Sequence, residues 1–178
     1  MPIPRDTHQA LHFPLPGALV GMLGGILMAL FTMLATATYL QVGFFTPLYA
    51  VAAPLIGQQP FMTSRLQGGF YLAPGPALLG LVVHLLWAAL WGVIFGLLAR
   101  RLHLTGGVAI ISGLVYGLLV MLVMIFIVGA IVGAPNLLQL LGSFSFTIAN
   151  ALFYGLPLGL WPVVQPQLFT AIPTRQAA

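Results

Sequence analysis

Four long apolar stretches dominate the hydrophobic pattern of the chain. They cover roughly residues 17–40, 76–99, 106–133 and 140–164. A helix needs about 20 apolar residues to cross the ~30 Å hydrocarbon core of a bilayer, and each stretch is at least that long. Because backbone groups inside lipid must be paired within their own segment, we expect each stretch to be helical. The pattern predicts an all-α integral membrane protein, a bundle of four transmembrane helices.

The segment 41–75, between the first two stretches, has a different pattern. It is too apolar for an ordinary loop, and prolines interrupt it at Pro47, Pro54, Pro60 and Pro74. Thr46 followed by proline is typical of a helix start, with Thr46 as the N-cap. The helix predicted after it, 48–57, is too short to cross a bilayer. We therefore expect 41–75 to form a cap on one membrane face, with a short interfacial or re-entrant helix.

Composition supports this fold class and narrows the partners. Sixty-one per cent of the residues are hydrophobic and 3% are charged, whereas a soluble domain has about a quarter charged residues. The 178 residues are enough for a single membrane domain, 1–178, in contact with the lipid bilayer. The five basic residues are scattered, which argues against a nucleic-acid partner. The absence of cysteine excludes disulfides and thiolate metal sites.

The distribution of arginine predicts an orientation. With four spans, both termini lie on the same side, together with Arg5, Arg100, Arg101 and Arg175, while Arg65 lies on the other side. Loops rich in Lys and Arg stay in the cytoplasm. We therefore expect cytoplasmic N- and C-termini, a periplasmic or exterior cap, and a multi-pass location in a cytoplasmic (inner) membrane.

Small residues recur at every fourth position within the stretches. This spacing places them on one face of each helix. Helices in lipid associate by close packing, and small residues let their backbones approach. We expect packing stripes that include Gly21, Gly25, Gly80, Gly92, Gly96, Gly113, Gly117, Gly155 and Gly159. The pattern leaves open whether these contacts are made within the chain or with another protein.

No stretch contains Asp, Glu, Lys or Arg, and His84 is the one histidine inside a stretch. An ionisable side chain within a membrane span is a functional candidate. Gly80 stands one turn before His84, and this small-x-x-x-His spacing is similar to that of bacterial antenna polypeptides. A macrocycle would fit beside Gly80, with Trp87 and Trp91 as an aromatic wall. One hypothesis is therefore a haem or bacteriochlorophyll ligand. The alternatives are a neutral histidine bonded across the bundle to Ser, Thr or Asn, and a proton or substrate site.

The fourth stretch carries polar residues at spacings of four, three and four. Ser143, Thr147, Asn150 and Tyr154 are expected to share a face. An unpaired amide is costly at the middle of a membrane, so Asn150 needs a partner, and His84 is one candidate. The face is interpreted either as the lining for a small permeant or a quinone head group, or as a set of interhelical hydrogen bonds.

Several functions are excluded by missing residues. No stretch contains an acid, which excludes a carboxylate proton relay or cation site, and no metal site is expected. Catalytic motifs such as HExxH, GxSxG and a phosphate loop are missing, so we expect neither catalytic residues nor an enzyme. The first functional hypothesis is a non-catalytic accessory or structural subunit of a larger membrane complex, respiratory or photosynthetic, with other membrane-protein subunits as partners. The alternatives are a small transporter or channel for a neutral or hydrophobic permeant, and a tetrapyrrole-binding protein.

Residues 20–100 also carry a resemblance. The segments GFFTPLY (43–49), APLIG (53–57), PGPALLG (74–80) with His84, and WGVIFGLL (91–98) look like a group of uncharacterised small polytopic bacterial membrane proteins. The resemblance implies a bacterial protein with several spans and carries no activity with it. It also implies that the cap and the surroundings of His84 form one feature, because the matching residues concentrate there.

Overall fold

The computed structural model describes residues 14–166, and within that range it consists of helices and turns without any strand. Four helical segments are long and apolar enough to cross a membrane: Leu15–Ala37, Pro74–Arg101, Gly106–Val132 and Ser143–Val164. The all-helical fold with four such segments is therefore confirmed, and each segment begins and ends within three residues of its predicted bounds.

Two of the four long segments contain a π-helical stretch between α-helical parts. The elements in chain order are α2 (Pro14–Ala37), α3 (Thr46–Ile56), α4 (Gln59–Gln67), α5 (Pro74–Arg101), α6 (Gly106–Val123), η1 (Met124–Gly129), α7 (Ala130–Val132), α8 (Leu137–Leu141), α9 (Ser143–Ile148), η2 (Ala149–Gly155) and α10 (Leu156–Val164). Elements η1 and η2 are π-helical. The third rod is α6–η1–α7 and the fourth is α9–η2–α10. The fourth rod begins at Ser143 and not at residue 140, because Gly142, with a φ of 73°, separates it from α8.

The first and second rods, α2 and α5, pack through glycine. A Cβ atom added to Gly21 would collide with the carbonyl oxygen of Ala88 and would lie 2.9 Å from the Cα atom of Gly92. A Cβ added to Gly25 would lie 2.6 Å from that of Ala88. Only residues with little or no side chain allow the two backbones to come this close.

The third and fourth rods pack in the same way. A Cβ atom added to Gly113 of α6 would lie 2.5 Å from the Cα atom of Gly159 in α10. Gly117 faces the carbonyl oxygen of Asn150, and Gly155 faces that of Gly113. The predicted stripes on these four rods therefore lie in contacts within the chain. Gly96, also in the predicted set, is buried.

Tyrosines join the two pairs of rods. The hydroxyl of Tyr154 in η2 donates to the carbonyl oxygen of Ala88 over 2.8 Å, and that of Tyr116 in α6 donates to the carbonyl oxygen of Trp91 over 2.8 Å. Both acceptors are backbone atoms of α5. The helix α2 also packs against η2, since a Cβ atom added to Gly24 would lie 3.1 Å from the Tyr154 ring. The main buried cluster forms around these contacts: Ala88, Phe95, Ala99, Val120, Tyr154, Leu158 and Trp161.

The cap between α2 and α5 contains two helices, α3 and α4, where the sequence predicted one. Thr46 is the first residue of α3 and not its N-cap, and its hydroxyl is 2.8 Å from that of Ser64 in α4. The polar sequence of α4 shows no amphipathic period, which is why the helix was missed.

Tyr49 ties the cap to the beginning of α5. Its hydroxyl donates to the carbonyl oxygen of Tyr71 over 3.1 Å and accepts from the N–H of Ala73 over 2.7 Å. Burial raises the pKa of the Tyr49 phenol, although the Ala73 N–H acts in the opposite direction. The phenol therefore keeps its proton, and with it the bond to Tyr71, at neutral pH.

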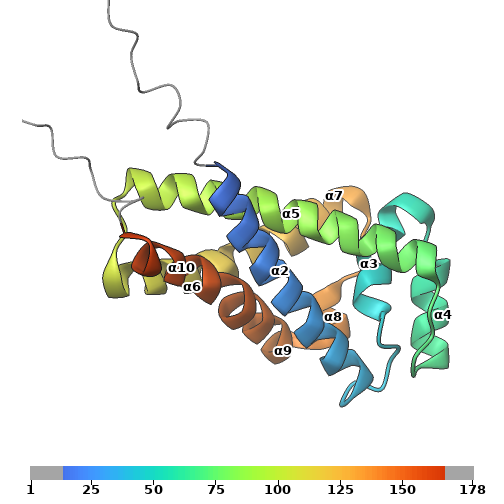
Figure 1. Ribbon diagram of the computed structural model, residues 1–178. Coiled ribbons are helices and arrows are strands. Elements are labelled where there is room, and N and C mark those ends of the chain that lie inside the picture. Colours follow the sequence, from blue (N-terminus) through green and yellow to red (C-terminus); the bar gives the residue numbers. More distant parts are fainter. Residues whose placement is uncertain (1–13, 167–178) are drawn as a thin grey trace, which may run out of the picture.

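The cap lies at one end of the bundle, and the start of α2 and the end of α10 lie at the other (Figure 1). Arg65 is in α4 of the cap, whereas Arg100 and Arg101 end α5 near the start of α2 and the end of α10. Arg5 and Arg175 lie outside the described residues. Among the described residues, one end of the bundle has two arginines and the other has one, as the predicted orientation requires. The assignment of one end to the cytoplasm stays a prediction.

Candidate functional site

An inner cavity of about 110 Å³ lies between the rods, where the two pairs meet above the cap. Every rod and α3 contribute to its wall. Most of the lining is apolar, and the polar or aromatic N–H and O–H groups come from a small set: Thr32, His84, Trp87, Trp91, Asn150 and Tyr154.

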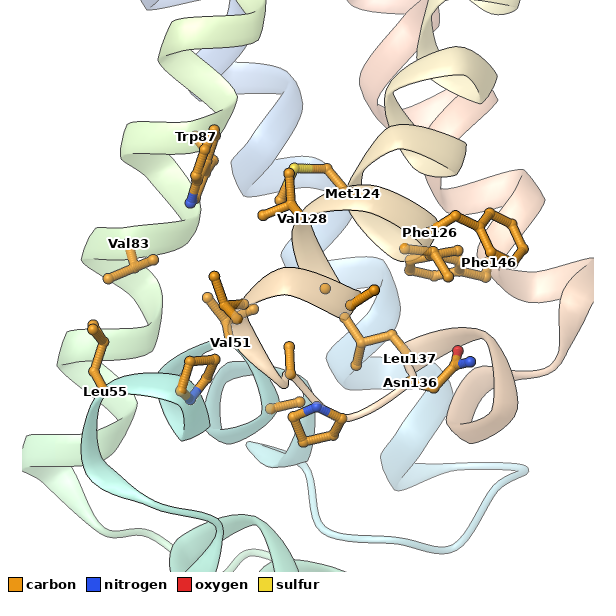
Figure 2. A pocket seen from close by; sticks show the side chains of 18 residues that line it. Val51, Leu55, Val83, Trp87, Met124, Phe126, Val128, Asn136, Leu137 and Phe146 are labelled. Carbon is orange, nitrogen blue, oxygen red and sulfur yellow. The ribbon is translucent and has the colours of Figure 1, made fainter.

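A larger outer cleft of about 560 Å³ adjoins this cavity (Figure 2). Its floor is α3, one wall is α5, and the other walls are η1, α7 and α8. The cleft and the cavity share the lining residues Val51, Trp87, Met124, Leu137 and Phe146. The two spaces therefore adjoin along these shared residues.

The outer cleft opens at the side of the bundle. Three of its lining residues reach the outer surface: Leu55 in α3 is 64% exposed, Phe126 in η1 is 62% exposed, and Val132 in α7 is 47% exposed. In Figure 2 the cleft lies between α5, which carries Val83, and the rod that carries Val128. Its entrance is therefore bordered by the apolar surface of the long helices.

Both π-helical segments border these spaces. Met124, Phe126 and Val128 of η1 line the outer cleft, and Asn150 and Tyr154 of η2 line the inner cavity. Short π-helical turns are rare and occur frequently at functional sites. The π-helical segments are therefore a second indication, separate from the size of the two spaces, that a functional site lies here.

His84 is bonded across the bundle to the backbone. Its Nε2 atom is 3.0 Å from the carbonyl oxygen of Gly25 in α2. A carbonyl only accepts, so Nε2 carries the proton and donates. The alternative of a hydrogen bond across the bundle is therefore the one seen, with a backbone oxygen as acceptor in place of a Ser, Thr or Asn side chain.

The surroundings of His84 do not fit a tetrapyrrole. An axial ligand would need Nε2 without its proton, whereas Nε2 donates to Gly25. The room expected beside Gly80 is filled, because a Cβ atom there would collide with the carbonyl oxygen of Leu48 in α3.

The structure separates the four polar residues of the fourth rod. Asn150 and Tyr154 are buried and line the inner cavity, whereas Ser143 is exposed and Thr147 lines neither space. The cause is η2, whose i to i+5 hydrogen bonding changes the helical period between Thr147 and Tyr154. Spacing rules for an α-helix therefore do not hold along this rod.

Asn150 and His84 line the same cavity but are not hydrogen-bond partners. The side-chain nitrogen of Asn150 donates to the carbonyl oxygen of Phe146 over 2.8 Å, one turn earlier in its own rod. His84 is bonded to Gly25 instead. Each residue thus meets its need for a partner at a backbone carbonyl.

Trp87 and Trp91 are the site residues whose role the sequence missed. They were interpreted as the wall of a pigment site, yet both line the inner cavity, and Trp87 also lines the outer cleft. The indole N–H of Trp91 is buried without a hydrogen-bond partner among the described residues. The sequence feature that predicts their common location is their spacing of three and seven residues from His84, because this spacing places all three side chains on one face of α5.

No protein-family model, curated protein or solved structure matches the chain. The site is therefore interpreted from its geometry, and the resemblance to small bacterial membrane proteins stays an expectation.

Proposed function

We propose that the chain is a multi-pass membrane protein that binds a neutral, membrane-soluble compound in the outer cleft and the inner cavity. The observation that carries the proposal is the side entrance, because a compound dissolved in lipid can enter there without crossing water. The cleft volume of about 560 Å³ is in the usual range for small-molecule sites, roughly 300–1,000 Å³.

The lining supports a neutral ligand. No Asp, Glu, Lys or Arg lines either space, and an ionised ligand held there would be left without an opposite charge. The hydrogen-bond donors of His84 and Tyr154 are both engaged by backbone carbonyls. Both groups are therefore held in place by the backbone, which fits a binding role.

The arginine distribution supports one placement in the membrane. We assign the end with Arg100, Arg101 and both termini to the cytoplasm, and the cap to the periplasm or exterior, by the positive-inside rule. The resemblance supports a bacterial cytoplasmic (inner) membrane as the location. In this placement the cap forms the outward floor of the cleft.

A small carrier for a hydrophobic compound is the role that this cleft supports best. The Asn150→Leu variant removes a polar group from the cavity and is expected to slow transfer of the compound in reconstituted vesicles. Transfer no faster with the native protein than in empty liposomes would refute the carrier role.

The accessory-subunit hypothesis has lost one of its supports. The sequence leaves open whether the packing stripes contact another protein, and on the rods they pack within the chain. The hypothesis stays a prediction for purification from native membranes in mild detergent, followed by mass spectrometry of the co-migrating chains. Migration in a stoichiometric complex with redox or pigment proteins would favour it over a carrier that acts alone.

A substitution at the cleft entrance tests the binding role. Ala130 lines the outer cleft and is exposed, so Phe at this position narrows the entrance without displacing the core. We expect Ala130→Phe to reduce the hydrophobic compound that co-purifies with the protein by about tenfold, the factor for ~1.4 kcal/mol. The measurement is organic extraction of the purified protein followed by mass spectrometry.

The matched control is Val115→Phe. Val115 lies on the same rod and is 53% exposed, but lines neither space. Its variant should retain the native amount of compound. Equal retention by both variants, or no compound above the detergent background in the native protein, would contradict the proposal.

A further inference from the structure

We propose that the bound compound carries an uncharged carbonyl head group that accepts hydrogen bonds from Trp87 and Asn150, with an apolar tail in the outer cleft. This inference rests on the proposed function and names the ligand class of the same site.

The positions of the hydrogen-bonding side chains and the sizes of the two spaces set the direction of the ligand. The inner cavity contains the polar side chains of Thr32, His84, Asn150 and Tyr154. Among the side chains that line the outer cleft alone, only that of Asn136 is polar, and the cleft is the larger space. The head group is therefore placed at the inner end, beside the side-chain donors, and the longer apolar tail in the outer cleft.

Most donors in the inner cavity already have acceptors. The hydroxyl of Thr32 donates to the carbonyl oxygen of Ala29 over 2.9 Å, and His84 and Tyr154 donate to backbone carbonyls. The indole N–H of Trp91 has no acceptor among residues 14–166, although it is buried. This nitrogen is enclosed by protein atoms, so a ligand in the cavity does not reach it, and the donors left for a ligand lie on Trp87 and Asn150.

Trp87 supplies a donor at the junction of the two spaces. Figure 2 shows its ring standing across the cleft from Met124 and Val128, with the ring nitrogen toward the cleft. An indole N–H can only donate, and this one makes no hydrogen bond within the part of the chain that the structure describes. Asn150 has one amide hydrogen left after its bond to Phe146.

A carbonyl oxygen meets this requirement because it accepts two hydrogen bonds and donates none. The same chemistry occurs in two kinds of membrane compound, the ring of an alkyl quinone and the esters of an uncharged acyl lipid. The indole faces also offer a surface on which a flat quinone ring can stack.

A fluorescence titration tests the inference directly. The protein, purified in alkyl maltoside micelles that contain no carbonyl, is titrated with a short-chain alkyl benzoquinone that quenches tryptophan fluorescence. We expect saturable quenching of the native protein. Trp87→Phe keeps an aromatic ring but removes the donor, and should raise the midpoint roughly tenfold.

Two further variants protect this result from artefacts of folding and signal. Asn150→Leu leaves all tryptophans in place and should also raise the midpoint, while native-like elution and helicity show that each variant is folded. Trp161→Phe is the matched control, because Trp161 lines neither space and its N–H donates to Gln165 over 3.1 Å. Its midpoint should equal that of the native protein, and unchanged midpoints in Trp87→Phe and Asn150→Leu would overturn the assignment of donors.

Competition experiments distinguish a quinone from an ester lipid as the ligand. They also distinguish failure of the head-group assignment from failure of the proposed binding function. Displacement of the quinone by an uncharged acyl ester without a hydroxyl group, such as a triacylglycerol, supports a carbonyl head group shared with ester lipids, and failure to displace it supports a quinone ring. A carbonyl-free alkane that competes as well as the quinone would overturn the head group and leave the hydrophobic cleft intact. If none of these compounds binds saturably, both the head group and the proposed function fail.

Discussion

Gly113→Leu is expected to separate the third and fourth helical rods and to give the largest loss of stability in the chain. A Cβ atom at Gly113 would lie 2.5 Å from the Cα and N atoms of Gly159 and from the carbonyl oxygen of Gly155. All three are backbone atoms, which cannot move aside by changing a rotamer. We expect the free energy of unfolding to fall by at least ~3 kcal/mol and the melting temperature to fall by about 10 °C.

Gly107→Leu is the control for this prediction. Gly107 lies in the same helix, is exposed, and has open space around its Cβ position. Thermal unfolding in detergent, followed by the loss of the monodisperse peak in size-exclusion chromatography, compares the two variants. If Gly113→Leu had the same melting temperature as Gly107→Leu and the native protein, the close approach of α6 and α10 would be contradicted.

Gly80→Leu is expected to detach the cap from α5 while the four rods remain packed. A Cβ atom at Gly80 would collide with the carbonyl oxygen of Leu48 and lie 3.1 Å from its Cα atom. Leu48 belongs to α3, the floor of the outer cleft. We therefore expect amide hydrogen exchange within 46–67 to accelerate about 100-fold, the factor for ~3 kcal/mol, and ligand binding to be lost with it.

Hydrogen exchange followed by mass spectrometry resolves this effect along the chain. Peptides from α6 and α10 should keep their protection in Gly80→Leu, because neither helix touches Gly80 in the structure. Gly107→Leu serves again as the control, and its cap amides should exchange as slowly as those of the native protein. Uniform loss of protection over all rods would show that the cap is part of the cooperative core and not a separate layer.

The long rods were predictable because length and apolarity are properties of each segment alone. Any run of more than about 20 apolar residues satisfies the requirement for a spanning helix, whatever surrounds it. The contact faces were predictable for a similar reason, since glycine at every fourth position leaves a groove on its own helix. The helix against which each face packs could not be predicted. Gly80 belongs to the same stripe as Gly92, yet it faces α3, whereas Gly92 faces α2.

The candidate site depended on features that no single segment contains. The π-helical turn η2 moves Asn150 and Tyr154 into the cavity and leaves Ser143 and Thr147 outside, and no α-helical spacing predicts that division. Pro157 follows η2 and lacks an amide hydrogen, which removes an α-helical bond at that point, but the sequence does not say how the helix adapts. The outer cleft needs α3 beneath α5 and η1 opposite it, an arrangement that only the tertiary fold specifies.

The side entrance changes how affinity at this site is to be counted. For a protein embedded as proposed, the reservoir of ligand is the lipid phase, where hydrophobic compounds reach concentrations far above those in water. The relevant quantity is then the mole fraction of ligand among the lipids, and modest intrinsic affinity is enough for high occupancy. The same reasoning predicts that a midpoint measured in micelles shifts in proportion to the detergent added, so midpoints of variants are comparable only at a fixed ratio of detergent to protein.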